Sequence, residues 1–412
     1  MAGSARAARA ILLMAGSQAW HAVIDAHKLL RADLLPHALG GNLVNYNMLG
    51  RTEFFCCPTA GGCGAVSGNL SYMPCPNVSV DDHCNGLLLL LDSVANPATR
   101  QWARLPPQPP PREGIEAVFY YEEPYLVFDP AISPDYEVFL MPVVASWAEL
   151  DHSMAESEWP PSLCETRVFS SRTGCWEERS FVREGEPAGS IATMQQAWTM
   201  DKRYSVYWRE ALYMHSQNGY FCKISMANNK CRVIKQSLTD DSDENHQEAY
   251  LGKSENGVYC AIVDHKFRIR VWILDESSGQ MEWVLKHENN LEQVFLSQDF
   301  YEPGDGAWTL EDLNHDAYYD KDSSGEETAA EPKITNHTFV TLLGFHPFKE
   351  IVFLNSSLSR GFAYDLNSSK VQDLGNMCPT YYRYIAGQHA YIQASFPYTP
   401  CWMENMLPAI KF

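Results

Sequence analysis

Two short apolar runs flank a polar turn in the stretch that decides the fold: VWILD at 271–275, SSG at 277–279 and MEWVL at 281–285. β-Branched and aromatic residues of this kind favour extended strands over helices. Serine and glycine supply the backbone conformations that a tight turn requires. The stretch therefore predicts a β-hairpin whose second strand begins near a tryptophan.

The same unit recurs four more times along the chain. In each copy an apolar strand ends in Asp, Ser or Asn, a polar turn follows, and a second strand begins. The other copies are 87–102, 167–176, 221–234 and 361–374. They start roughly 50 to 90 residues apart, and the shorter intervals approach a kelch-like period. Such regular recurrence indicates one repeated structural unit.

A second pair of strands precedes most copies, for example at 125–140 and 257–263. Two hairpins make a four-stranded unit, which is the blade of a propeller. We therefore predict a mainly β protein with a kelch-like β-propeller of five to six blades. The first hairpin lacks two strands, and we expect the apolar stretch 391–396 to supply them and close the ring. We expect the sixth blade, if present, within 290–336. An irregular β-sandwich is the alternative fold.

Composition excludes several functional classes. The 412 residues carry a formal net charge of −20, whereas nucleic-acid binding and docking on anionic membranes need basic surfaces. Much of the negative charge lies in two segments, 236–248 and 296–336, which we predict to be acidic surface loops. The 12 cysteines are irregularly spaced, which favours reduced thiols and a place in the cytoplasm or nucleus. No nucleic-acid or membrane partner is expected.

The patterns that would carry chemistry are incomplete. GKS at 252–254 resembles the end of a P-loop, but Gln247 stands where its first glycine is required. The segment 320–331 has oxygen ligands spaced as in a calcium loop, yet Pro332 follows where a helix should continue. The cysteines and histidine within 56–84 lack the paired spacing of a zinc site. We therefore expect no catalytic residue, no metal site and no cofactor.

Several segments resemble a known family. DHCNGLL at 82–88, followed by NPATRQW at 96–102 and LP at 105–106, resembles the start of the F-box-associated domain of plant F-box proteins. Upstream, QAWHAVID at 18–25 resembles the tail of an F-box. Three further segments fit the same group, at 127–130, 168–176 and 343–347.

The resemblance implies a non-catalytic substrate-recognition subunit of a Skp–cullin–F-box ubiquitin ligase. Such a subunit binds a Skp-type adaptor through the F-box and a protein substrate, here unknown, through the propeller. The Leu-Pro opening of an F-box is missing from this sequence, so the F-box is N-terminally truncated. Only Trp20, Val23 and Ile24 carry over as adaptor-binding residues. Two alternatives remain: a stand-alone propeller that binds proteins without a ligase, and a propeller-fold hydrolase with carboxylates in its channel.

These observations divide the chain into four parts. We expect a non-homologous N-terminus at 1–18, a helical F-box remnant at 19–41, connecting strands and loops at 42–83, and the propeller at 84–412. Two arginines and a short apolar run within 1–18 also outline a weak targeting peptide.

Overall fold

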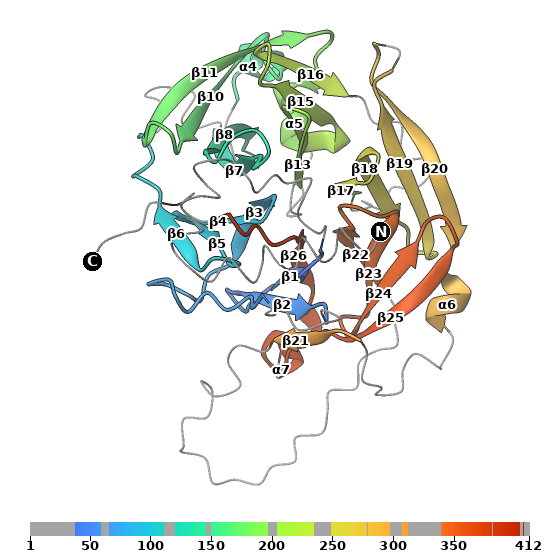
Figure 1. Ribbon diagram of the computed structural model, residues 1–412. Helices are drawn as coiled ribbons and strands as arrows, with labels where there is room; N and C mark the ends of the chain where they lie inside the picture. Colours follow the sequence, from blue (N-terminus) through green and yellow to red (C-terminus); the bar gives the residue numbers. More distant parts are fainter. Residues whose placement is uncertain are drawn as a thin grey trace, which may run out of the picture.

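The computed structural model is a ring of β-sheets around a central axis (Figure 1). It describes residues 38–58, 66–110, 120–145, 150–196, 204–234, 249–277, 279–296, 307–311, 339–380, 382–403 and 407. The predictions for 1–18, for the helical remnant up to residue 37, for 236–248 and for most of 296–336 therefore lie outside the described residues. The same holds for the segment 320–331.

Three blades are separate four-stranded antiparallel sheets whose strands follow one another in the chain. Blade 1 comprises β3 (Val80–Cys84), β4 (Leu87–Leu90), β5 (Ser93–Asn96) and β6 (Gln101–Arg104). Blade 4 comprises β17 (Ala249–Ser254), β18 (Gly257–Val263), β19 (Arg268–Asp275) and β20 (Glu282–Asn290). Blade 5 comprises β22 (Val340–Phe345), β23 (Ile351–Ser356), β24 (Arg360–Asp365) and β25 (Lys370–Asn376).

Blades 2 and 3 are joined into one eight-stranded sheet. Blade 2 comprises β7 (Tyr120–Phe128), β8 (Tyr136–Val144), β10 (Leu163–Ser170) and β11 (Cys175–Glu184). Blade 3 comprises β13 (Ser205–Trp208), β14 (Ala211–His215), β15 (Phe221–Ser225) and β16 (Lys230–Ile234). The outer strands β11 and β16 pair in parallel and make the join. A small ladder of β9 (Glu158–Trp159) and β12 (Gly189–Ser190) lies beside them.

Blade 6 closes the ring and corrects one prediction. The C-terminal strand β26 (Ile392–Tyr398) pairs with β1 (Gly41–Tyr46), which pairs with β2 (Thr52–Cys56) and then β21 (Thr309–Glu311). The C-terminal stretch therefore closes the ring as expected, but it does not complete the first hairpin, whose inner strand is β3. The strands at 42–56 belong to this closing blade, and the part of 290–336 that the structure describes adds β21 to it.

The recurring sequence unit is the outer hairpin of a blade. In blades 2 to 5 it spans the third and fourth strands, and in blade 1 the matching turn joins β5 to β6. Asp275 and Asp365 show why the unit ends in a polar residue, because each side chain accepts hydrogen bonds from backbone N–H groups of the following turn. Blade 6 lacks the unit since its outermost strand arrives from a distant segment. The mainly β propeller prediction is thus confirmed, with six blades among the described residues.

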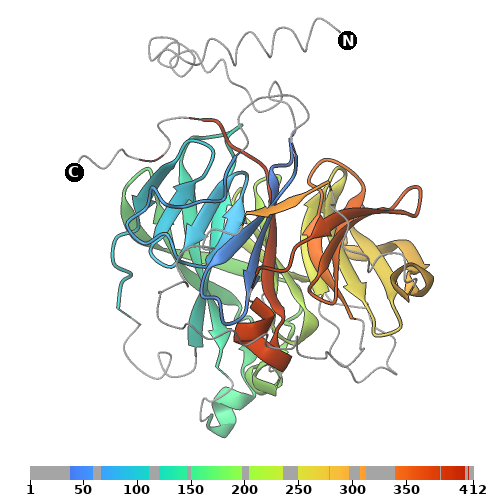
Figure 2. The same cartoon turned by 90° about the horizontal axis from the view of Figure 1, so that it is seen from below.

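Three of the four short helices that the structure describes lie toward one face of the ring (Figure 2). The four are α4 (His152–Ala155), α5 (Ile191–Gln196), α6 (Glu292–Leu296) and α7 (Tyr382–Ala386), with the 3-10 turns η2 (Gln217–Gly219) and η4 (Gly387–His389). Figure 2 shows α4, α5 and α7 at the same end of the molecule. Helices α5 and α7 lead into the starts of the inner strands β13 and β26, so the ends of the inner strands lie toward the opposite face. None of the described helices is long and apolar enough to cross a membrane.

The core lies between the blades. The tryptophans that follow the turns pack on it at separate places instead of forming a cage. Trp283 contacts Phe221 of the neighbouring blade with ring centroids 5.0 Å apart, and Trp176 contacts Phe169 at 5.6 Å. Trp102 packs against the largest core cluster. The contact of Trp283 with Phe221 contributes to the interface between blades 3 and 4.

Candidate functional site in the central channel

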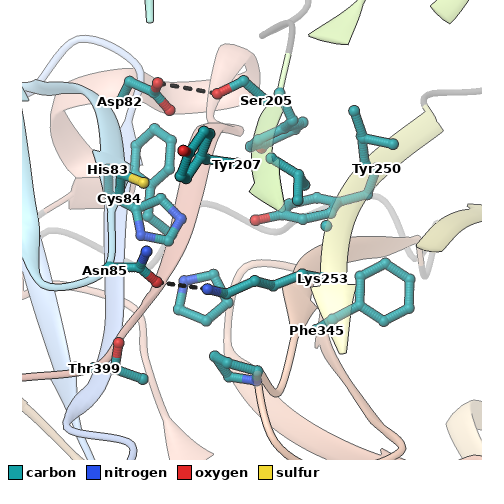
Figure 3. A pocket seen from close by; sticks show the side chains of 17 residues that line it. Asp82, His83, Cys84, Asn85, Ser205, Tyr207, Tyr250, Lys253, Phe345 and Thr399 are labelled. Carbon is teal, nitrogen blue, oxygen red and sulfur yellow. Dashed lines mark hydrogen bonds between the residues drawn. The ribbon is translucent and has the colours of Figure 1, made fainter. Parts of the chain in front are cut away.

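A pocket opens into the central channel between the inner strands of blades 1, 3, 4, 5 and 6 (Figure 3). It encloses about 580 Å³, including open solvent at its mouth. Concave sites on the axis of a ring gather side chains from several blades, which makes this pocket the leading candidate for ligand binding. The lining residues are 82–85, 204–207, 250–253, Phe345, Pro347, Phe396, Pro397 and Thr399.

The turn between β3 and β4 forms one side of the mouth. Asn85 and Gly86 have φ angles of 46° and 94°, the left-handed conformations that a two-residue hairpin turn requires. A Cβ atom on Gly86 would lie 2.5 Å from the Cβ of Cys401, so glycine is needed there for close packing as well. Asn85 donates through Nδ2 to the carbonyl of Phe128 at 2.6 Å. Its Oδ1 atom is thereby held toward the pocket.

Lys253 faces this turn from the end of β17. Its Nζ atom donates to Asn85 Oδ1 at 2.5 Å (Figure 3). Burial lowers the pKa of Lys253, while the nearby Cys84 and Asp129 act in the opposite direction. Within the described part of the chain no carboxylate forms an ion pair with Lys253. The mouth of the pocket therefore presents an ammonium group whose recorded partner is a neutral amide.

Asp82 lies deeper and is fully occupied by structural contacts. It is 2% exposed. Its Oδ2 atom accepts from the backbone N–H of Leu126 at 2.8 Å and from Ser205 Oγ at 3.0 Å. These bonds connect the inner strands of blades 1, 2 and 3. Asp82 thus holds the wall of the pocket in place, because a buried carboxylate requires such donors.

Aromatic rings form the opposite wall. The Tyr204 and Tyr250 rings lie 3.9 Å apart between centroids, and Tyr204 also contacts Phe396 at 6.1 Å. Tyr250 donates from its hydroxyl to the carbonyl of Ser395 at 2.8 Å, which fixes the ring. His83 packs on the same Phe396 ring at 5.3 Å. Each of the three rings of Tyr204, Tyr250 and Phe396 is at most 4% exposed, so the wall is a rigid, largely buried support behind the charged mouth.

The thiol in the pocket is not activated. Burial raises the pKa of Cys84 to about 12, and its Sγ atom donates to the Phe128 carbonyl at 3.2 Å. A nucleophilic cysteine requires the thiolate, which a raised pKa disfavours at neutral pH. The pocket is therefore better suited to bind than to attack a ligand.

The adaptor-binding residues predicted from the sequence, Trp20, Val23 and Ile24, lie outside the described residues. The GKS segment is not a phosphate cradle: it lies on β17, where Ser254 donates to the carbonyls of His346 and Lys349 at 3.1 and 2.6 Å. Its Lys253 nevertheless reaches the pocket. Two features of the sequence could have indicated the pocket: the lysine at the end of an otherwise apolar strand, and the Cys-Asn-Gly turn.

Three solved structures with similar folds are distant. The first is HIRA(644-1017), with a TM-score of 0.24 and 10% identity over 62% of this chain and 54% of that chain, so about half the length of that fragment is spanned. The second is YCF48 bound to D1 peptide, with a TM-score of 0.31 and 6% sequence identity over 82% of each chain. The third is the periplasmic gluconolactonase PpgL of Pseudomonas aeruginosa, with a TM-score of 0.30 and 12% sequence identity over 87% of this chain and 99% of that chain. None of these similarities carries an argument about this chain.

Comparison at the level of sequence is more informative. No curated protein matches the chain. A family model described as F-box protein At3g26010-like, beta-propeller, matches residues 71–303. This range is more than half of the chain, and it runs from β3 through α6 and includes the Asn85 and Lys253 sides of the pocket. The chain therefore belongs to the family of F-box protein At3g26010-like β-propellers.

Proposed function

We propose that this protein is a non-catalytic substrate-recognition subunit of a Skp–cullin–F-box ubiquitin ligase, and that its propeller holds a protein substrate. The observation that carries the proposal is the family match over 71–303. The channel pocket supports it, since the pocket combines a charged mouth with a rigid aromatic wall. The substrate is a protein because an F-box subunit selects the proteins that its ligase modifies.

Adaptor binding is assigned to the N-terminal segment at 19–41, through Trp20, Val23 and Ile24. These residues stand in the stretch that resembles the tail of an F-box. Ligase subunits of this type act in the cytoplasm or nucleus, which we propose as the location. The propeller itself is assigned no contact with the adaptor.

The pocket favours binding over hydrolysis. A glycosidase-type mechanism requires two carboxylates facing each other across the substrate. Among the described residues that line the pocket, Asp82 is the one carboxylate, and both donors recorded for it are structural. Together with the protonated Cys84 thiol, this arrangement supports a receptor without an active site.

Co-purification tests the proposal. Tagged full-length chain is mixed with a Skp-type adaptor, and the variant Trp20→Ala/Val23→Ala/Ile24→Ala is compared with Lys253→Met as the matched control in the propeller. We expect the adaptor to bind the parent chain and the control but not the triple variant. If the parent does not bind, while a version carrying a grafted intact F-box does, then this chain is a stand-alone binding module.

A further inference from the structure

We propose that the mouth of the channel pocket binds a carboxylate of an extended peptide, and that the ammonium group of Lys253 forms the ion pair with it. This inference rests on the proposed function, because it names the chemical class of the group that the propeller recognises. The buried rings of Tyr204, Tyr250 and Phe396 support the pocket behind this contact.

The first step is the unbalanced charge of Lys253. Two other lysines of the described chain have carboxylate partners: Lys286 lies 2.9 Å from Glu350, and Lys223 lies 2.8 Å from Glu276. Lys253 has one recorded bond, to the neutral Asn85 amide, although an ammonium group offers three donors. Removing a charge from water without a counterion costs free energy, so the site is completed by an anion from outside.

The second step is the charge of that anion. Asp82 lines the same pocket, and Asp129 lies close enough to affect the pKa of Lys253. These two carboxylates repel any added negative charge. A phosphate group carries about −1.5 to −2 charges at neutral pH. A carboxylate, with a single negative charge, is repelled less.

The third step is access. Asn85, Lys253, Pro347 and Thr399 lie at or beyond the ends of inner strands, on the face opposite α5 and α7. The β3–β4 and β17–β18 connections on this face have two residues each. Turns of two residues are too short to fold over the mouth. An extended peptide crossing this face can place one acidic group beside Lys253.

Selection from a random peptide library tests the inference. The full-length chain is the bait, and peptides are displayed both with amidated and with free C-termini. We expect the selected peptides to share one acidic group. Enrichment of internal Asp or Glu in the amidated library identifies a side-chain carboxylate, whereas enrichment confined to the free library identifies a C-terminal carboxylate.

Variants separate recognition from folding. Lys253→Met is expected to bind the selected peptides about 10- to 100-fold more weakly, the range for losing a charged hydrogen bond. Lys253→Arg retains most of the affinity, and Lys266→Met, at an exposed lysine, retains all of it. Lys253→Met should also unfold at the same or a higher temperature, because it removes a charge without a recorded ion-pair partner; a marked loss of stability would assign Lys253 a structural role instead.

The inference would be overturned by selection of peptides without acidic groups, by binding unaffected by Lys253→Met, or by tighter binding when phosphoserine replaces the acidic residue. A bait that captures the Skp-type adaptor but selects no peptide also refutes it, and leaves the proposed function intact. Conversely, acidic peptides selected by a chain that never captures the adaptor would support the carboxylate site and refute the role in a ligase.

Discussion

The seam between blades 2 and 3 and the seam between blades 4 and 5 are built in different ways. At the first, the long strand β11 reaches β16, and the two pair in parallel through the backbone, with Val182 N–H donating to the Asn229 carbonyl at 3.0 Å. At the second, β20 pairs with no described strand beyond its own blade, and side chains make the polar contacts.

Two buried groups organise the second seam. Glu350 accepts from Tyr259 at 2.7 Å and from Asn256 at 2.8 Å, and lies 2.9 Å from Lys286 Nζ. Tyr364 joins β24 to β20 by hydrogen bonds with His287 at 2.7 Å and with Asn289. A backbone seam tolerates most substitutions, whereas a side-chain seam depends on particular residues and on their protonation. The two seams should therefore respond differently to single substitutions and to acid.

The largest expected effect comes from Glu350→Gln. Glu350 is 6% exposed, and the substitution leaves Lys286 without its counterion. The Lys286 side chain is 26% exposed, so most of the loss comes from the hydrogen bonds that Tyr259 and Asn256 donate to the charged carboxylate. Hydrogen bonds to charged groups contribute about 1.5 to 3 kcal/mol, so we expect the free energy of unfolding to fall by about 2 to 3 kcal/mol. Urea unfolding followed by tryptophan fluorescence measures the change. A loss below about 0.5 kcal/mol, the size typical of surface substitutions, would show that this seam does not depend on its buried carboxylate.

Acid is expected to weaken the same seam. Burial, helped by Lys349, lowers the pKa of His346 from 6.5 to about 4. The neutral ring accepts from Phe348 N–H through Nδ1 at 3.1 Å. Because the unfolded chain takes up the proton near 6.5 and the folded chain only near 4, this contribution is complete above 6.5 and is lost as the pH falls through 4.

Over this window we expect a loss of about 2 kcal/mol, less than the full linkage value because the ring is partly solvated. Unfolding free energies measured through the window, for the parent and for His346→Asn, provide the test. The asparagine offers an acceptor oxygen in place of Nδ1 but does not titrate, so its profile should be flatter. Equal slopes of unfolding free energy against pH in the two proteins would show that His346 does not cause the acid sensitivity.

The repeat was readable from the sequence because turn chemistry is local. Residues such as Asp275 and Asp365 cap their own turns, so each outer hairpin carries its own signature. Blade 6 carried none, since it combines strands from 41–56, 309–311 and 392–398. Its pairing is set by long-range packing, and the prediction that the last strand completes the first hairpin was wrong for that reason. The parallel join of β11 to β16 likewise depends on how two blades are placed.

The pocket was less predictable than the ring. Asn85 belongs to a turn that the sequence marks clearly, but its partner Lys253 lies 168 positions away. Their contact follows from the circular order of the blades, which no local pattern contains. The structural role of Asp82 could not be predicted for a similar reason, because its hydrogen-bond donors lie on two other inner strands. What the sequence could indicate was a recognition domain and its family, and these rest on motifs that are contiguous in the chain.

A smaller effect is expected from Tyr364→Phe. The substitution removes the hydroxyl that bonds with His287 and Asn289 but keeps the buried ring. A single hydrogen bond contributes about 1 kcal/mol, and both partners on β20 are accessible enough to bind water instead. Urea unfolding should therefore show a lower midpoint with an unchanged slope. Tyr391→Phe, at a half-exposed tyrosine, is the control and should leave the midpoint where it is.

The smallest effect is expected from Glu184→Gln, the counterpart of Glu350→Gln in the other seam. The hydrogen bond from Lys230, with a further contribution from Arg232, lowers the pKa of Glu184, so its contribution is present at neutral pH and is lost in acid as the carboxylate is protonated. Both cations are solvent-exposed, and such pairs contribute little. The backbone bond of Val182 stays intact, so hydrogen exchange at that amide should remain as slow as in the parent. Rapid exchange there would mean that the seam between blades 2 and 3 also depends on its side chains, and the contrast between the two seams would disappear.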